Sequence, residues 1–516
     1  MRESRTHKSI YNSAVAMSYY VLGLFLGFFS RKIFLDFLGT DILGLNTTAQ
    51  NLLQFLNLAE LGIGSAVGFS LYRPLKEKDE TAVNEIVTLQ GMLYKRIGIF
   101  IAIGGGVLMA FFPLIFKKMD LPLWYAYASF GVLLFSALLS YFVNYKQIVL
   151  TSNQKNYKVQ YSYTSVTLLK IIFQMAAVYY FAEGYVWWLI LEVVFAIIAS
   201  IALHKTTLKD YPTLKKATAT FKDLRDKYTF IVKKIKQLFF HKIAGFALTQ
   251  SSPLIIYALI DLSVVTIYGN YLLIISGIQK IVFAMFNSMD AGVGNLVAEG
   301  DEVKIRKVFL ELFSVRFSIA AILAFSFFSL SGPFVILWIG EEYLLPGSTV
   351  ILLTVMLFIM LARFTVDTFL NAYGLYGDIW APVIETLLNI GLSVLLGYFY
   401  GLNGIIGGVL ISQFLVILFW KPFYLIMKRM NGFLGTYIRT FLVHAVMAVG
   451  IGIICWWGSN KMLDFTFDNV IVLVGIGGLL VVAYSLLLIT GLAMASPGMR
   501  YFMSRIKNIA GRPSKL

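Results

Sequence analysis

Cysteine, histidine and charged residues are scarce in this sequence. Its 516 residues contain one cysteine, Cys455, which excludes a disulfide framework and a cysteine-rich metal site. The four histidines, His7, His204, His241 and His444, are too scattered for a ligand motif, and there is no GxxxxGK[ST] loop for nucleotide phosphates. We therefore expect neither zinc chemistry nor ATP hydrolysis, and we predict no metal site and no resident cofactor.

Apolar residues, in contrast, make up 59% of the chain, charged residues only 14%, and the mean hydropathy is +0.78. A soluble protein of this length has too little interior to hide so much apolar surface, so an ordinary soluble enzyme is excluded. The apolar residues also gather in long runs, which predict an all-α membrane protein. No connection between runs on the predicted outer side is long enough to hold a catalytic domain, and we predict that the protein is not an enzyme.

Scanning for runs of about 20 apolar residues predicts fourteen membrane-spanning helices. Arg2, Arg5 and Lys8 precede the first run without a small-residue cleavage site, so we expect a retained helix rather than a signal peptide. The predicted spans are 10–34, 43–71, 92–116, 123–149, 159–181, 186–204, 238–260, 265–289, 307–339, 349–373, 380–400, 403–427, 436–457 and 467–494.

The positive charges follow this topology. The chain has 43 Lys and Arg against 27 Asp and Glu, a net charge of +16, and most of the basic residues fall in the loops that share a side with the two termini. The exceptions on the other side are Arg31, Lys32, Lys117, Lys118 and Lys461. Basic loops are typically cytoplasmic, so both termini are predicted to be cytoplasmic. The asymmetry also supports the count of fourteen spans, because losing one span would invert the side of every later loop. The basicity therefore reflects topology, and no nucleic acid is expected as a partner.

A weak internal repeat divides the chain. A shift of 220 residues places Leu150 on Leu370 and Gly184 on Gly404, and a shift of 225 places Gly44 on Gly269. Two groups of six spans in one orientation predict two lobes related by a pseudo-two-fold axis along the membrane normal. The predicted regions are an N-terminal lobe (1–204), a basic cytoplasmic linker (205–237), a C-terminal lobe (238–430), and two extra helices with a basic tail (431–516). The linker is expected to contact anionic lipids or to dock a partner.

Several basic residues lie near the middle of predicted membrane spans, where a charge is unfavourable. Lys170, Lys280, Arg316 and Arg363 each lie about 13 to 17 Å from the predicted cytoplasmic end of their span. Together they cost about 10 to 14 kcal/mol on insertion scales, which suggests a function. If they face a cleft between the lobes, they form a cationic chamber for an anion. Alternatively, each pairs with a buried acid or snorkels to the interface: Asp367, four residues after Arg363, lies on the same helix face. Glu311, five residues before Arg316, lies about 140° round the helix and is a poor partner for it. Lys421 lies close enough to the cytoplasmic end of its span to snorkel, and we leave it out of this set.

Buried acids form a second set, comprising Glu60, Glu192, Glu311, Asp367 and Glu385. A carboxylate inside the membrane can bind H⁺ or Na⁺ in one state and release it in another. We rank Asp367 and Glu385 first as ion-coupling residues and add Glu60; the alternative is that these acids only neutralise the basic residues. Pro253 removes a backbone hydrogen bond in mid-helix and marks either a static kink or a hinge.

Four segments carry a family resemblance. SRKIFLDFLGTDILGLNTTAQNLLQFLNLAELGIGSAVGFSLYRPLKEKD, NYKQIVLTSNQKNY, VTIYGNYLLIISGIQKIVFAMFNSM and APVIETLLNIGLSVLLGYFYGLNGIIGGVLIS resemble the Wzx-type polysaccharide flippases of the multidrug, oligosaccharidyl-lipid and polysaccharide (MOP) exporter superfamily. The resemblance implies a two-lobed transporter with a MATE-like V-shaped cavity, and it places Arg31 at the family's first-span Arg position. It also implies a cationic lumen, consistent with Lys170, Lys280, Arg316 and Arg363 as substrate-binding residues.

The implied function is to move undecaprenyl diphosphate-linked oligosaccharide units across a bacterial inner membrane by alternating access, for O-antigen, lipopolysaccharide or capsule synthesis, driven by Na⁺ or H⁺. A polysaccharide polymerase and a chain-length regulator are candidate partners. Two alternatives stay open: a multidrug or cation antiporter of the same superfamily, and a non-transporting scaffold of polymer assembly. A membrane glycan polymerase or acyltransferase is disfavoured because such an enzyme is expected to have a large external loop or a buried histidine, and we expect neither here.

Overall fold

The computed structural model describes residues 5–60, 62–117, 119–287, 290–375, 377–378, 380–462 and 469–510. Throughout these residues the chain forms helices and short connections, without a strand, which confirms the predicted all-α class. Nine helices in this part of the chain are long and apolar enough to cross a membrane. Each predicted span falls on one helix or on a run of consecutive helices, so these helices are consistent with fourteen spans. Lys118 lies outside the described residues.

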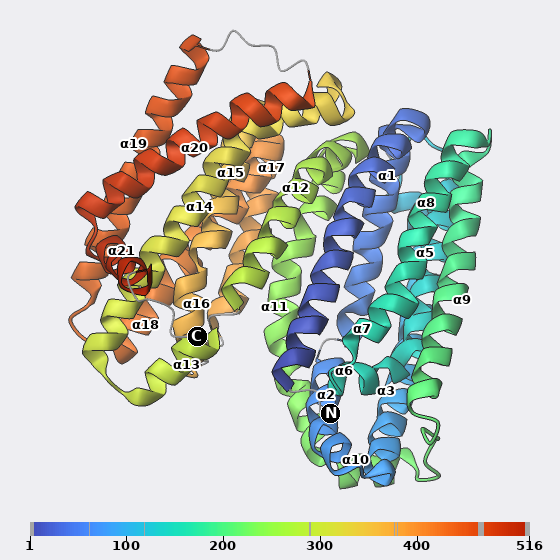
Figure 1. Cartoon of the computed structure of the whole chain (residues 1–516). Helices are drawn as coiled ribbons and strands as arrows, with labels where there is room; N and C mark the ends of the chain where they lie inside the picture. Colours follow the sequence, from blue (N-terminus) through green and yellow to red (C-terminus); the bar gives the residue numbers. More distant parts are fainter. Residues whose placement is uncertain are drawn as a thin grey trace. The chain divides into compact units, whose positions relative to one another are not determined.

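The chain divides into two compact units, the first ending at Thr266 and the second beginning at Ile267. The division therefore falls early in α12 and not in the predicted linker, and the predicted lobe boundaries stay predictions. The helices that lie in unit 1 (Figure 1) are α1 (Arg5–Leu56), α2 (Ile63–Glu77), α3 (Glu80–Ala110), α4 (Phe112–Ile115), α5 (Trp124–Phe142), α6 (Ile148–Ser152), α7 (Asn156–Val159), α8 (Ser165–Tyr180), α9 (Gly184–Asp210), α10 (Phe221–Lys227) and α11 (Thr229–Leu259).

Unit 2 holds the remaining helices and a π-helical stretch, Phe414–Trp420. Its helices are α12 (Leu262–Asn287), which starts in unit 1, α13 (Asp290–Glu299), α14 (Glu302–Ile339), α15 (Gly347–Ala362), α16 (Phe364–Ala372), α17 (Trp380–Gln413), α18 (Lys421–Arg429), α19 (Leu434–Met462), α20 (Val470–Ala495) and α21 (Pro497–Ala510).

Glycine and local breaks separate the predicted spans. The first two spans meet within α1 at Gly39, whose φ of 80° and ψ of 176° turn the chain between two helical parts. The second span is itself interrupted: a 3₁₀ turn, Asn57–Glu60, and the left-handed Gly62 (φ 97°) stand between α1 and α2. Gly401 (φ 56°) similarly separates two predicted spans within α17. Hydropathy detects the spans, but it does not detect the break beside Glu60.

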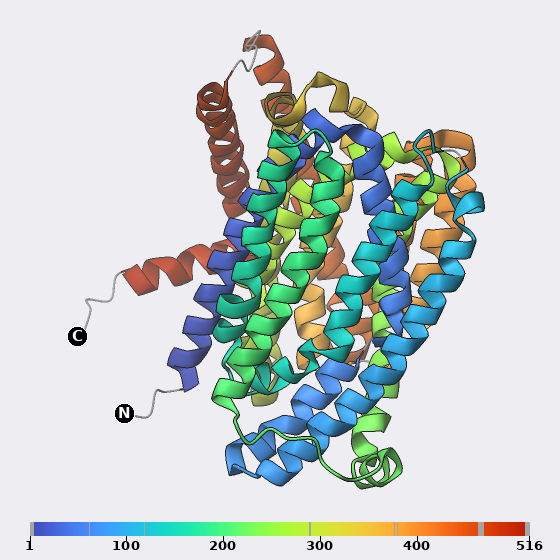
Figure 2. The same cartoon turned by 90° about the vertical axis from the view of Figure 1, so that its right-hand side faces the viewer.

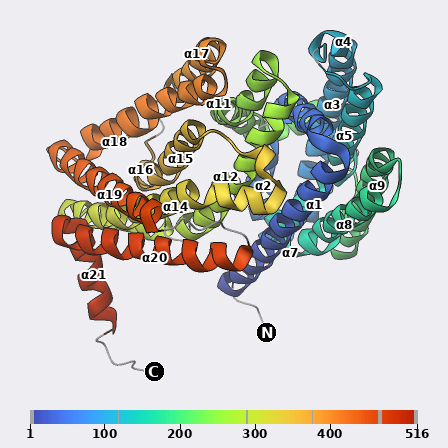
Figure 3. The ribbon, with the colours of Figure 1, turned by 90° about the horizontal axis from the view of Figure 1, so that it is seen from above.

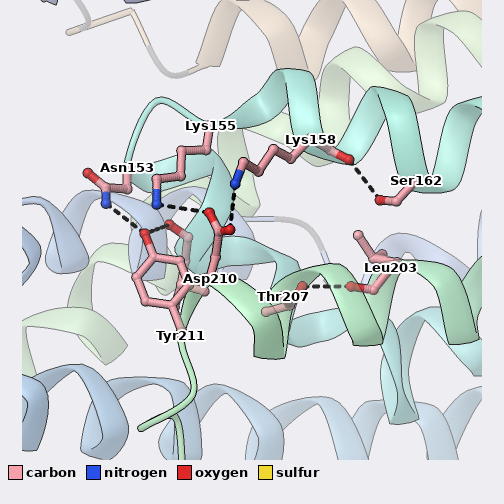
Figure 4. Close-up of polar contacts among 9 residues, drawn as sticks. Asn153, Lys155, Lys158, Ser162, Leu203, Thr207, Asp210 and Tyr211 are labelled. Atoms are coloured by element: carbon pink, nitrogen blue, oxygen red, sulfur yellow. Dashed lines mark hydrogen bonds and ion pairs between the residues drawn. The ribbon is translucent and has the colours of Figure 1, made fainter. Parts of the chain in front are cut away.

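In unit 1, α8 and α9 run side by side (Figure 2); α8 also contacts α1, and α9 contacts α5. The connection from α5 to α8, which contains the NYKQIVLTSNQKNY segment, is fastened to the end of α9 (Figure 4). The ammonium groups of Lys155 and Lys158 both pair with the carboxylate of Asp210, at 2.9 Å for Lys155. Asn153 donates a 2.6 Å hydrogen bond to the hydroxyl of Tyr211. This connection is therefore an ordered part of unit 1.

In unit 2, the two extra C-terminal helices pack on α14, as Figure 3 shows for α14, α19 and α20. A buried aromatic cluster joins them, in which Phe325 stacks on Tyr484 with ring centroids 4.1 Å apart. In the first turn of α21, Gly498 touches α14 so closely that a Cβ there would lie 2.2 Å from the carbonyl oxygen of Leu310. The helices after residue 430 are thus integral to unit 2.

The two parts of α17 generate a stability prediction. A Cβ on Gly408 would lie 2.3 Å from the backbone nitrogen of Ser393, whereas one on neighbouring Gly407 would meet nothing within 4 Å. We expect Gly408→Ala to lower the free energy of unfolding by about 1 to 3 kcal/mol, because the helix parts must separate. Gly407→Ala, the matched control, should be neutral or stabilising. Thermal unfolding of the detergent-solubilised proteins checks this; equal melting temperatures for the two variants would contradict it.

Candidate functional site: charged side chains in the two units

Lys170, the predicted substrate-binding lysine of unit 1, is held by an acid from the next helix. Lys170 on α8 has no acid within its own helix, but its ammonium lies 2.6 Å from the carboxylate of Glu192 on α9. The other oxygen of Glu192 accepts a 3.0 Å hydrogen bond from Gln174, one turn after Lys170. The side chains of Lys170 and Glu192 are only 16% and 9% exposed. The pair therefore neutralises both charges in a mostly apolar environment.

Glu60, a predicted ion-coupling residue, lies at the helix break of unit 1. Its carboxylate accepts a 2.7 Å hydrogen bond from the hydroxyl of Tyr94 on α3. Beside it, Tyr141 on α5 donates to the side-chain oxygen of Asn57, at 3.1 Å. A carboxylate among neutral donors, at a point where the helix is interrupted, has the chemistry of a group that can exchange H⁺ or a cation. The tyrosines were not identified from the sequence, because only the packing of α3 and α5 brings them to Glu60.

Arg31 and Pro253, also predicted to be functional, lie within unit 1 as well. The guanidinium of Arg31 on α1 donates a 3.1 Å hydrogen bond to the carbonyl oxygen of Thr266. This bond fixes α1 against the end of the unit, which is a structural role alongside the predicted binding role. Pro253 lies inside α11, which continues as a helix on both sides of it. Its assignment as a hinge stays a prediction.

Unit 2 contains a charged cluster around Asp367. Its carboxylate lies 2.6 Å from the guanidinium of Arg363, one turn earlier, which confirms the ion pair indicated by the four-residue spacing. The second oxygen lies 3.4 Å from the ammonium of Lys421 at the start of α18. Glu385 on α17 is buried, 3% exposed, and interacts electrostatically with all three groups. Two bases and two acids from three parts of the chain thus meet in one place.

Lys421 is the residue that sequence reasoning missed. Its position near a predicted span end favoured snorkelling to the interface, and that interpretation is wrong: the side chain is 17% exposed and pairs inward with Asp367. The signal was the Lys-Pro step that follows the apolar run FLVILFW, where the π-helical stretch ends and α18 begins. The direction of the side chain, however, depends on tertiary packing.

Arg316 on α14 is almost fully enclosed, at 1% exposure. Its guanidinium donates to the hydroxyl of Thr368 at 2.8 Å and to the carbonyl oxygens of Phe364 and Phe286 at 3.1 and 3.3 Å. It also lies 4.8 Å from the centre of the Phe286 ring. Arg316 therefore ties α14 to α16 and α12. Glu311, the acid considered as its partner, instead pairs with Arg505 of α21 at 2.9 Å.

Lys280 differs from Arg316 and Arg363, the other predicted substrate-binding residues of unit 2, because it is exposed on α12. The neighbouring residue, Gln279, contacts the sulfur of Met360 on α15 at 2.8 Å. Among the predicted substrate-binding residues, Lys280 thus presents its charge at the surface of its unit. No group of three or more His, Cys, Asp or Glu that could hold a metal occurs in the described part of the chain.

The expectation that no histidine is buried is wrong. His444 on α19 is fully buried, and its ring nitrogens lie 2.7 Å from the carbonyl oxygen of Thr440 and 3.0 Å from the hydroxyl of Ser314 on α14.

The comparisons with known proteins identify the fold. No protein-family model and no curated protein sequence matches this chain. Among solved structures, it is similar to the lipid II flippase MurJ in an inward closed conformation, with a TM-score of 0.65 and 16% identity over 94% of this chain and 99% of that one. It is also similar to an inward-facing multidrug resistance MATE family transporter of the MOP superfamily, with a TM-score of 0.57 and 14% identity over 81% of this chain and 99% of that one. For an outward-facing structure of such a transporter, the TM-score is 0.53 and the identity 15%, over 84% of this chain and 98% of that one. The chain thus has the helical fold of these membrane transporters.

The Lys170–Glu192 pair predicts a specific stability pattern. Glu192→Gln leaves the ammonium of Lys170 without its carboxylate in a low-dielectric site, so we expect a loss of about 3 to 5 kcal/mol in unfolding free energy. The double variant K170Q/E192Q, which removes both charges, should recover most of it. Asp36→Asn is the matched control, because Asp36 pairs with Lys32 at 3.3 Å on the surface; its effect should stay below about 1 kcal/mol. Thermal unfolding in detergent measures all three variants, and a double variant that is no more stable than Glu192→Gln would contradict the pairing.

Proposed function

We propose that the chain is a flippase for undecaprenyl diphosphate-linked oligosaccharides, acting by alternating access in a bacterial inner membrane with both termini in the cytoplasm. One observation carries the proposal: basic side chains stand within apolar helices in both units of a fold shared with a lipid II flippase over 94% of this chain. A diphosphate cannot cross hydrocarbon, so its carrier must offer positive charge at membrane depth. Arg and Lys form strong, charge-assisted hydrogen bonds to phosphate oxygens.

The proposed binding groups are Lys170 and Arg31 in unit 1 and Lys280, Arg316 and Arg363 in unit 2. Lys170 and Arg363 already have carboxylate partners. Binding of a phosphate therefore requires partner exchange: the carboxylate leaves the base and takes up H⁺ or Na⁺, and the phosphate replaces it. Such an exchange links anion binding to cation binding without ATP, since each charge stays compensated throughout. Asp367, Glu385 and Glu60 are the proposed ion-coupling residues.

The surrounding system is part of the same proposal. The basic stretch 205–237 would lie against anionic lipids, and a polysaccharide polymerase and a chain-length regulator would receive the exported unit for O-antigen, lipopolysaccharide or capsule synthesis. Transport itself makes and breaks no covalent bond, so no catalytic residue is assigned. A drug or cation antiporter is the second candidate, favoured by the likeness to MATE family transporters. The basic residues of both units oppose a cationic cargo.

Export in cells tests the binding groups. We expect Lys280→Ala to abolish surface polysaccharide while protein level and membrane insertion stay normal, because an exposed lysine is not needed for folding. Lys304→Ala is the matched control, since Lys304 is exposed and paired with Glu299 near the start of α14; it should leave export unchanged. Unimpaired export in Lys280→Ala would remove Lys280 from the site.

Lys170 needs a two-step test because its substitution also strands Glu192. We expect Lys170→Ala to abolish export, and we expect K170Q/E192Q to remain inactive although it relieves the unpaired carboxylate. Polysaccharide export is measured alongside the amount of protein in the membrane. Restored export in the double variant would show that Lys170 serves only to neutralise Glu192.

Ion coupling predicts a different phenotype for Asp367. In proteoliposomes carrying a labelled lipid-linked oligosaccharide, Asp367→Asn should reduce transport to the level seen without a Na⁺ or H⁺ gradient. Asp378→Asn, the control, removes an acid of the same unit that accepts a 3.3 Å hydrogen bond from the indole of Trp420; it should keep its gradient dependence. Full gradient dependence in Asp367→Asn would exclude Asp367 as the coupling group.

A further inference from the structure

A second cationic feature lies on unit 1, away from the buried ion pairs. A pocket of about 200 Å³ opens where α3, the end of α5 and the segment after α9 meet. Two lysines line it, Lys95 on α3 and Lys216 on the segment before α10, together with the aromatic side chains of Tyr141, Phe142 and Tyr145. Positive charge above an aromatic wall is a combination that suits an anionic group attached to an apolar body.

Backbone hydrogen bonds hold the Lys216 segment in place against α3. The amide of Ala217 donates a 2.9 Å hydrogen bond to the hydroxyl of Thr88, and the amide of Lys215 donates a 3.0 Å bond to the side-chain oxygen of Asn84. The ring of Tyr145 lies so close to α3 that a Cβ on Gly91 would meet it at 2.9 Å. The pocket is therefore built by fixed elements on both sides.

The charge of this pocket is not neutralised by acids. Among the described residues, neither Lys95 nor Lys216 forms an ion pair. Acids of α3 and α10 have other partners: Glu85 on α3 binds Lys227 and Tyr228, both at 2.6 Å. Asp223 accepts hydrogen bonds from Thr220 that lower the pKa of its carboxyl group. Two positive charges thus remain for a ligand.

An apolar surface continues from the pocket along α3. Met92, Lys95, Ile99 and Ile103 are spaced by three or four residues and share one helix face. Ile99 and Ile103 are 46% and 63% exposed, and Phe142 of the pocket wall is 43% exposed. From Lys95 to Ile103 the face extends about 12 Å. Lys95 stands near the start of the predicted third span, so this face would lie in the acyl-chain region while the lysines lie at head-group level.

We propose that this pocket binds the phosphate of an anionic phospholipid whose acyl chains lie along Ile99 and Ile103. Lys95 and Lys216 bind the phosphate oxygens, and Tyr141, Phe142 and Tyr145 contact the glycerol region. Free phosphate offers the same charge, but it would leave the adjoining apolar face without a ligand. The site contains none of the proposed phosphate-binding residues of transport, although Tyr141 of its wall also lies beside Glu60. It narrows the general attraction of the 205–237 stretch for anionic lipid to one pocket.

Native mass spectrometry of the full-length protein tests the site, with phosphatidylglycerol and phosphatidylcholine as probes. The variant K95Q/K216Q removes the two charges, and K95R/K216R retains them. The matched control K215Q/K222Q removes two exposed lysines of the same region that do not line the pocket. We expect the wild type to retain phosphatidylglycerol in preference to phosphatidylcholine, and we expect K95Q/K216Q to bind it roughly 30-fold more weakly.

The remaining measurements separate the possible outcomes. K215Q/K222Q and K95R/K216R should bind phosphatidylglycerol like the wild type, and millimolar inorganic phosphate should not displace it. An equal loss of binding in K95Q/K216Q and K215Q/K222Q would show diffuse attraction and overturn the proposal, as would displacement by inorganic phosphate alone. Thermal unfolding checks the fold of each variant; if K95Q/K216Q is destabilised, loss of phosphatidylglycerol binding in the folded K95R/K216R protein would overturn the proposal as well.

Discussion

The cost of placing a charge among apolar helices constrains this molecule more than any other interaction. Lys170 and Arg363 lie on predicted membrane spans, and the structure places a carboxylate within 2.6 Å of each. Arg316 is enclosed by backbone carbonyls and a hydroxyl instead. These contacts reduce the desolvation penalty, and each also joins helices or successive turns that must stay together. The same constraint makes the basic residues informative about function, because apolar side chains of similar size would stabilise these positions as well.

The pairing of basic side chains with carboxylates determines how an anion would be bound. A chamber lined by unpaired cations would attract a diphosphate strongly and release it slowly. Lys170 and Arg363 are already paired with carboxylates, so a phosphate can bind them only by replacing the carboxylate. The displaced carboxylate must then bind H⁺ or a cation. Arg363, Asp367, Lys421 and Glu385 form the most developed set of this kind. Because the two basic and two acidic side chains compensate one another, a small change in ion binding would shift the affinity of the basic groups for the cargo.

The all-α class could be predicted from hydropathy, since each predicted span falls on one helix or on a run of consecutive helices. The pair of Arg363 and Asp367 could also be predicted, because a spacing of four residues within one predicted span places both side chains on the same face. Contacts between helices could not: Glu192 reaches Lys170 only through the packing of α8 on α9, and Tyr94 reaches Glu60 only because the second span breaks at Asn57–Gly62. Lys421 was misjudged for the same reason. A single sequence predicts how deep in the membrane a charged residue lies, but it does not predict which neighbouring helix its side chain faces.

The central claim is that positive side chains inside the membrane carry a lipid-linked diphosphate across it. The most direct measurement is the movement of a fluorescently labelled undecaprenyl diphosphate oligosaccharide between leaflets of proteoliposomes that contain only this protein. If basic side chains carry the diphosphate, movement should require the protein, an ion gradient should accelerate it, and a soluble diphosphate should inhibit it by competition. Movement equal to that in protein-free liposomes, or transport of organic cations in its place, would contradict it.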